Sequence, residues 1–250
     1  GTAGGTLWES RTPPNNHSGK PPHRMVRGFS AFRVHCMRYD LVIFDNDGVL
    51  VDSEPISNRL LAAYLTELGY PTSYEDSIRD YMGSAMHRIH DLVAERTGER
   101  LPADFDDVFH RRVFEAFERE LRPVPGVVAV LEKLAADEVP YCVASSGSHE
   151  RIRVGHRTTG LDRWFDESRV FSSQDVGRGK PAPDLFRHAA ERMGVAPERC
   201  VVVEDSPLGV RAAVAAGMDV YGFTAMTPAA RLSGATQLFS SMGELSGLLH

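Results

Sequence analysis

The chain has 250 residues, of which 42% are hydrophobic, 25% charged and 8% aromatic, a composition typical of a globular protein with a sizeable apolar core. Its net charge is −6, yet residues 1–39 carry six Lys or Arg against one acid, so the rest is acidic and unsuited to nonspecific nucleic-acid binding. No apolar run reaches the roughly 20 residues of a membrane span, and three cysteines, two of them inside apolar runs, favour a reducing, cytoplasmic location over a disulfide scaffold.

Residues 1–38 predict an extension ahead of the folded part of the chain. Glycine, proline and asparagine are frequent there and the apolar residues show no periodicity, which is typical of a disordered leader or of a segment foreign to the native protein. A targeting peptide is an alternative because the segment is basic. Met25 and Met37 are possible natural starts.

The first elements predict one strand followed by a helical block. The apolar run 41–44 fits a strand buried on both faces. Apolar residues at helical spacing follow over 57–69, 86–96 and 105–119, and no convincing strand lies between them. The segment 55–121 is therefore expected to be mostly helical, and a proline-rich linker follows it over 122–126.

From residue 124 onward, predicted strands and helices alternate. The strands are expected at 140–145, 169–172, 200–203 and 219–223, and the helices at 126–137, 148–159, 183–193 and 207–216. Such alternation implies right-handed crossovers and a parallel sheet that helices cover on both faces. The expected fold class is α/β.

Ligands of such a sheet bind beyond the carboxyl ends of its strands, so the residues that follow the apolar runs form the candidate site. Asp45 and Asp47 follow the first run and, being two apart, can point the same way. One carboxylate could then attack a substrate while the other moves protons. A plain hairpin turn through 45–48 is the alternative, and the two interpretations are compatible.

Two further acids, Glu204 and Asp205, follow the run 200–203. They could simply cap the next helix. However, four acids at the ends of neighbouring strands would repel one another unless a cation lay among them. Oxygen ligands without a Cys/His cluster favour Mg²⁺ over zinc.

Lys180 is one of only three lysines in a chain that otherwise uses arginine. It could be a solvated loop residue, but Pro181 restrains its backbone and a compact ammonium suits a phosphoryl oxygen. Ser145 ends the strand 140–145 and Ser146 follows it. The Ser145 hydroxyl could donate a hydrogen bond to an oxyanion, and a helix start is the alternative. A Gly-x-Ser-x-Gly motif is absent from the sequence, so a serine-hydrolase triad has little support.

Four separated pieces together resemble the haloacid dehalogenase superfamily, and most of all its branch of small-metabolite phosphatases and β-phosphoglucomutase. The pieces are DNDGVLVDSEP (45–55), VASSGS (143–148), GKPAPDLF (179–186) and VVVEDSPLGVRAA (201–213). The resemblance extends from Asp40 to the end of the chain. It implies a Rossmann-like parallel-sheet core over 39–54 and 124–250, with a helical cap over 55–123 inserted after the first strand.

The resemblance also implies the reaction and the roles of the residues. Asp45 would be the nucleophile that forms an aspartyl-phosphate, and Asp47 would protonate the leaving oxygen and then act as base on water. Ser145 would hydrogen-bond the phosphoryl oxygens, and Lys180 would neutralise charge.

The family cofactor implied by the resemblance is Mg²⁺. It would be held by the carboxylates of Asp45 and Asp205 and by the main-chain carbonyl of Asp47, with Glu204 in support. An anionic carboxylate that attacks an anionic phosphate needs such cations to offset the repulsion.

Departures from the family pattern narrow the expected activity. Asp47 argues for phosphoryl transfer, because the hydrolytic dehalogenases of the superfamily lack this second aspartate. The cap segment contains no lysine, which counts against phosphonatase chemistry. The His and the cap Arg of β-phosphoglucomutase are missing near Ser57 and at Met86, which favours a hydrolase over a mutase.

We therefore expect a phosphatase of a small phosphorylated metabolite, with a sugar phosphate as the first candidate. Ser146, Glu54 and Arg88 are candidate substrate-binding residues. The alternatives are a sugar-phosphate mutase and a catalytically idle protein that retains the fold. The expected partner is the substrate alone, without nucleic acid or membrane. A monomer is compatible with the sequence, which does not determine the oligomeric state.

Overall fold

The computed structural model describes residues 38–82 and 86–249, so the predicted leader lies outside the described residues apart from Arg38. The strands are β1 (Leu41–Phe44), β2 (Tyr141–Ser145), β3 (Val170–Ser172), β4 (Cys200–Glu204), β5 (Asp219–Phe223) and β6 (Gln237–Phe239). The α-helices are α1 (Glu54–Glu67), α2 (Tyr74–Asp80), α3 (Met86–Thr97), α4 (Phe105–Glu120), α5 (Val127–Ala136), α6 (His149–Thr159), α7 (Asp184–Met193), α8 (Pro207–Ala216) and α9 (Met242–Leu248). Short 3-10 turns are η1 (Leu161–Arg163), η2 (Glu167–Arg169), η3 (Ser173–Asp175), η4 (Pro197–Arg199) and η5 (Ala229–Leu232).

The strands form one sheet in the order β3-β2-β1-β4-β5-β6, and every neighbouring pair is parallel. The predicted α/β fold with a parallel sheet is therefore confirmed. Strand β6 was not predicted, because it has three residues and two of them are exposed. In a parallel sheet the carboxyl ends of all strands meet at one edge, which brings together the loops that follow β1, β2 and β4.

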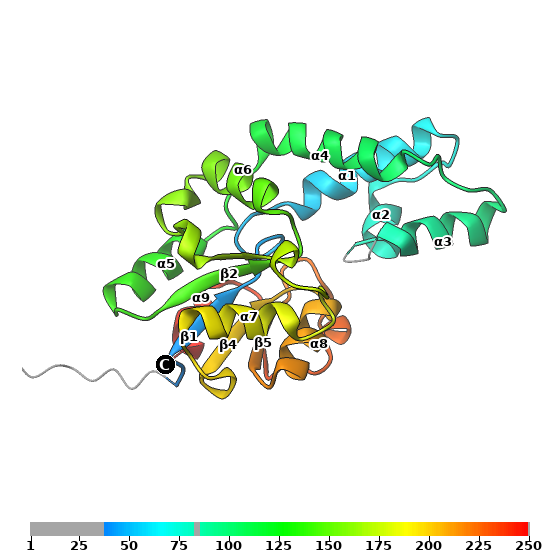
Figure 1. Cartoon of the computed structure of the whole chain (residues 1–250). Helices are drawn as coiled ribbons and strands as arrows, with labels where there is room; N and C mark the ends of the chain where they lie inside the picture. The colour runs from blue at the N-terminus through cyan, green and yellow to red at the C-terminus, as the bar shows by residue number, and fades with distance from the viewer. Residues whose placement is uncertain (1–37, 83–85, 250) are drawn as a thin grey trace, which may run out of the picture. The chain divides into compact units, whose positions relative to one another are not determined.

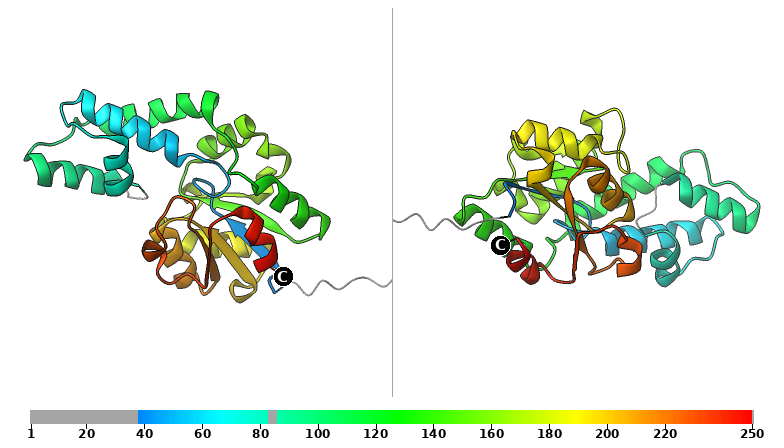
Figure 2. Two further views of the ribbon diagram at one scale, coloured as in Figure 1. Left: turned by 180° about the vertical axis from the view of Figure 1, so that it is seen from behind. Right: turned by 90° about the horizontal axis from the view of Figure 1, so that it is seen from below.

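Helices cover both faces of the sheet (Figures 1 and 2). Successive side chains of β1 point to opposite faces. Leu41 and Ile43 belong to the apolar cluster that includes buried residues of α7 and α8, while Val42 and Phe44 belong to the cluster that includes those of α5 and α9. The middle strands are buried on both faces, which explains why they appear in the sequence as continuous apolar runs.

The helices α1–α5 lie between β1 and β2, which confirms the helical cap expected after the first strand. Helix α1 begins at Glu54, earlier than the predicted start at residue 57, because Pro55 is accommodated in its first turn. The rings of Tyr64 in α1 and Phe105 in α4 stack with centroids 5.0 Å apart. Helix α5 packs against α9.

Helix α2 is an element that the sequence analysis missed. The Ser73 hydroxyl accepts from the backbone N–H of Asp76, and the Asp76 carboxylate accepts in return from the Ser73 N–H. This capping box, Ser-x-x-Asp, satisfies two backbone donors at the start of the helix. The pattern is visible in the sequence, but the helix that it starts is only two turns long.

Two further features of the described residues are the state of the cysteines and the length of the helices. Cys142 and Cys200 are buried and free, and Cys36 lies outside the described residues. Over residues 38–82 and 86–249, every helix is too short or too polar to cross a bilayer. The cytoplasmic location itself stays a prediction.

Candidate active site

The loop after β1 places two acids at the carboxyl edge of the sheet. It is not the hairpin that 45–48 alone would allow, since Val51 forms only isolated bridges, to Asp47 and to Pro123. Gly48 turns the chain with φ of +79°. A Cβ atom at Gly48 would overlap the Asp205 carboxylate, so glycine is needed both for the backbone conformation and for the approach of Asp205.

Three buried acids meet beyond β1 and β4. One carboxylate oxygen from each of Asp45, Glu204 and Asp205 lies within 4.8 Å of the other two. The Glu204 side chain occupies the space that a Cβ at Gly209 would take. These hard oxygen atoms are a donor set that could hold a divalent metal ion.

Lys180 lies against two of these acids. Its Nζ donates to Asp45 Oδ1 at 2.5 Å and to Glu204 Oε1 at 2.7 Å. The lysine side chain is 4% exposed and its Nζ is 4.9 Å from the centroid of the Phe186 ring. The interpretation of Lys180 as a solvated loop residue is therefore wrong.

The start of α8 explains how Glu204 is held. The Oε2 atom of Glu204 accepts a hydrogen bond from the backbone N–H of Ser206 at 2.7 Å. The Ser206 hydroxyl in turn accepts from the N–H of Gly209 at 3.0 Å and caps α8. The helix cap is thus Ser206, and Asp205 is left to point toward the acid cluster.

The negative charges of the acid cluster repel one another. Burial raises the pKa of Asp45 to about 7, although Lys180 opposes this shift. Burial and the negative charges of Glu204 and Asp45 raise the pKa of Asp205 well above its usual value. A divalent ion among these oxygens would remove the repulsion, so the residues present fit such an ion.

Asp47 has a different partner. Arg151, in the first turn of α6, donates from Nη2 to Asp47 Oδ1 at 2.9 Å. Burial alone would raise the pKa of Asp47, but the Arg151 guanidinium outweighs it and lowers the pKa, with help from Ser53 and Asn46. Nearby, burial and the Asp47 charge raise the pKa of Glu54.

A cleft of about 520 Å³ opens over this cluster. Eight of the nine predicted site residues line it: Asp45, Asp47, Glu54, Ser145, Ser146, Lys180, Glu204 and Asp205. Ser145 is buried, and its hydroxyl accepts from the N–H of Gly147 at 3.0 Å. Arg88 is absent from the lining among the described residues; its Nη1 is 3.0 Å from Glu95 Oε1, and its substrate-binding role stays a prediction.

Further residues line the cleft that were not named as site candidates, although Gly179, Ser206 and Leu208 lie within the motif segments 179–186 and 201–213. These further lining residues are Met82, Ser173, Val176, Gly177, Gly179, Ser206, Leu208 and Thr227. Arg231 of η5 donates to the backbone oxygen of Met82 at 3.0 Å and so joins the loop after β5 to the cap. Neither this contact nor that of Arg151 with Asp47 has a local sequence signal, because each partner lies more than 100 residues away along the chain.

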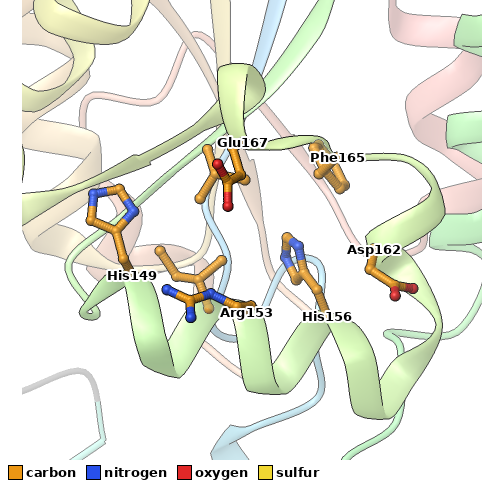
Figure 3. Close-up of a pocket in the computed structure, with 8 residues that line it drawn as sticks. His149, Arg153, His156, Asp162, Phe165 and Glu167 are labelled. Carbon is orange, nitrogen blue, oxygen red and sulfur yellow. The ribbon is translucent and has the colours of Figure 1, made fainter.

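A second cavity, of about 480 Å³, is lined partly by α6 (Figure 3). His149, Arg153 and His156 rise from that helix toward Phe165 and Glu167. The buried His156 also reaches the loop after β1, where its Nε2 is 3.0 Å from Asn46 Oδ1. Burial lowers the pKa of His156 to about 4, so its ring is neutral near pH 7.

Comparison with known proteins gives consistent results. The family model for haloacid dehalogenase-like hydrolases matches residues 39–217. The chain is 33% identical over 189 residues to 6-phosphogluconate phosphatase of Escherichia coli K12, covering 75% of this chain and 84% of that protein. It is 32% identical over 213 residues to hexitol phosphatase A of the same organism, covering 84% and 94%. A crystal structure of a haloacid dehalogenase-like protein of unknown function from Agrobacterium tumefaciens C58 superposes with a TM-score of 0.78 at 37% identity, covering 84% of this chain and 97% of that one.

Proposed function

The chain belongs to the haloacid dehalogenase-like hydrolases and is a phosphoric monoester hydrolase of that family, and on this premise we propose that it is an Mg²⁺-dependent phosphatase of a small phosphorylated sugar or related metabolite. The observation that carries the proposal is the meeting of Asp45, Lys180 and Asp205 beside Asp47 in one cleft. Asp45, Lys180 and Asp205 come from three separate segments of the sequence.

In the first step, one carboxylate oxygen of Asp45 attacks phosphorus and forms an aspartyl-phosphate. The bond between phosphorus and the ester oxygen breaks, and its electron pair stays on the leaving oxygen. Asp47, which must be protonated at this step although Arg151 favours its carboxylate form, donates its proton to that oxygen, so the leaving group departs as a neutral alcohol. Ser145 hydrogen-bonds a phosphoryl oxygen from the end of β2.

In the second step, Asp47 acts as a base. Its carboxylate takes a proton from water, whose oxygen attacks phosphorus. The bond between phosphorus and the Asp45 oxygen breaks, which releases inorganic phosphate and restores the Asp45 carboxylate. The same residue can serve both steps because it ends the first step ionised, as the second requires.

Two cations balance the negative charge. Lys180 already contacts Asp45 and Glu204 and offers its positive charge to the phosphoryl oxygens. Mg²⁺, held by the Asp45 and Asp205 carboxylates and the Asp47 main-chain carbonyl, with Glu204 in support, would screen the repulsion between nucleophile and phosphate. Lys180 and Glu204 keep Asp45 in place for this arrangement.

The relatives and the residues that line the cleft support a substrate class. The relatives named for 6-phosphogluconate and for hexitol support a phosphorylated sugar derivative. Met82, Leu208 and Thr227 give the cleft apolar and hydroxyl groups beyond the acids. Ser146 and Glu54 are proposed to contact the part of the substrate that leaves.

A phosphate-release screen tests the proposal. We expect the wild-type protein to release phosphate from at least one sugar or polyol phosphate with Mg²⁺, and to lose this activity with EDTA. Asp45→Asn should lower turnover roughly a thousandfold or more, because it removes the nucleophile. Asp107→Asn, at an exposed carboxylate of α4, is the matched control and should retain full activity.

Three results would contradict the proposal. Undiminished turnover by Asp45→Asn would reject the nucleophile. Failure of the wild type to release phosphate from a broad panel with Mg²⁺ would favour an idle protein of this fold. An isomerised sugar phosphate in place of free phosphate, formed with a bisphosphate activator, would establish the mutase alternative.

A further inference from the structure

Arg151 connects helix α6 to the loop that carries the two catalytic aspartates. It is 104 positions from Asp47 in the sequence, yet its Nη2 donates to Asp47 Oδ1 at 2.9 Å. Within residues 38–82 and 86–249, it is the only cationic side chain that forms an ion pair with Asp47. Arg151 is absent from the lining of the active-site cleft among the described residues, and Asp47 is the cleft residue with which it forms an ion pair.

The position of the Arg151 side chain is fixed from several sides. Its guanidinium carbon is 4.8 Å from the centroid of the Phe117 ring, which belongs to α4. A Cβ at Gly147 would lie 3.3 Å from Arg151 Cδ, so the absence of a side chain there leaves room for the arginine stem. Ser148 caps α6 by accepting from the Arg151 N–H at 3.2 Å. Core and cap together therefore determine where the guanidinium lies.

We propose that Arg151 is a positioning residue that holds the Asp47 carboxyl group by Oδ1 and so presents Oδ2 to the ester oxygen of the substrate. The inference rests on the proposed function, in which Asp47 protonates the leaving oxygen. As the bond between phosphorus and the ester oxygen breaks, that oxygen keeps the electron pair and takes the proton from Asp47 Oδ2. Asp47 is then a carboxylate paired with Arg151, ready to act on water.

An arginine that only joined α6 to α4 would give the same contacts, so the test must separate the two roles. Substrates whose leaving groups differ in their need for a proton separate the two roles. An alkoxide leaves poorly without a proton, whereas p-nitrophenolate leaves well without one. The ratio kcat/KM reports the steps up to the departure of the leaving group, so it isolates the first proton transfer from the later hydrolysis of the aspartyl-phosphate.

The experiment compares kcat/KM for the best sugar or polyol phosphate with that for p-nitrophenyl phosphate, both with saturating Mg²⁺. For Arg151→Met we expect a fall of roughly tenfold to a hundredfold on the alkyl phosphate and of less than about threefold on p-nitrophenyl phosphate. Arg151→Lys keeps the charge but not the planar fork and should recover part of the loss. Arg153→Met, on the same helix but exposed and facing the second cavity, should leave both values unchanged.

An equal loss on both substrates, or no loss on either, would overturn the inference. If the melting curve shows that Arg151→Met does not fold, the test uses Arg151→Lys instead and compares its loss in kcat/KM on the alkyl phosphate with its loss on p-nitrophenyl phosphate. Asp47→Asn separates this inference from the proposed function. If Asp47→Asn shows the selective loss and the Arg151 variants do not, the positioning role fails and the function stands. If Asp47→Asn shows no selectivity, Asp47 is not the acid and the assignment of the first step fails.

Discussion

Replacing Lys180 with methionine tests the buried charge cluster on which the site depends. The Lys180 side chain is 4% exposed, and those of its partners Asp45 and Glu204 are 10% and 0% exposed. Removal of one partner from a buried ion pair leaves an uncompensated charge and costs about 3–5 kcal/mol. Because Asp45 can take up a proton, we expect Lys180→Met to lower the free energy of unfolding by about 3 kcal/mol, the lower end of that range.

The chain supplies a matched control in Lys133. This lysine pairs with Asp137 at 2.8 Å, one helical turn away, and its side chain is 41% exposed. A helical pair four residues apart that solvent reaches contributes about 0.3–0.5 kcal/mol. Lys133→Met removes the same group from half-buried surroundings, so the two variants differ in the degree of burial and not in chemistry.

Urea unfolding at pH 8 with EDTA measures both variants, since bound metal would otherwise replace part of the missing charge. Burial raises the pKa of Asp45 to about 7 in the wild type, and loss of Lys180 would raise the pKa further. The cost of Lys180→Met should therefore be smaller at pH 6, where Asp45 is protonated more readily. Equal costs for the two lysines, or a cost below about 1 kcal/mol for Lys180, would refute the buried ion pair.

Three more outcomes follow from the same contacts. Gly209→Ala should reduce both stability and phosphate release, because its Cβ would overlap the Glu204 carboxylate, whereas Gly247→Ala, with open space around it, should change neither. Burial lowers the pKa of His156 to about 4, whereas the pKa of histidine in the unfolded chain is about 6.5. Between these two pH values the unfolded state binds more protons than the folded state. The free energy of unfolding should therefore fall by up to about 3 kcal/mol as the pH drops from 6.5 to 4. His156→Gln should flatten that part of the urea-unfolding pH profile, and an unchanged profile would contradict the burial of a neutral ring. Mg²⁺ should raise the melting temperature of the wild type but not of Asp205→Asn, and an equal rise in both would remove Asp205 from the metal site.

The sequence alone determined the class of fold and the region of the site. Runs such as 41–44 and 200–203 are apolar because their strands are covered on both faces, so the strand positions follow from the apolar runs. The parallel arrangement follows from the alternation of strands with helices. The acids after these runs mark the carboxyl edge of the sheet, where a parallel arrangement brings loops together. Two short elements were not predicted from the sequence. Strand β6 has three residues, and helix α2, which begins at a capping box, has seven.

Which side chains meet depends on how the helices and strands pack. Lys180 could have been solvated, but the fold buries it against Asp45 and Glu204. Arg151 is one of several arginines in α6, and the sequence does not indicate that it reaches Asp47 while Arg153 faces another cavity. Local patterns report backbone preference and burial, which depend on near neighbours, whereas an ion pair between residues 104 positions apart depends on how whole helices pack on the sheet.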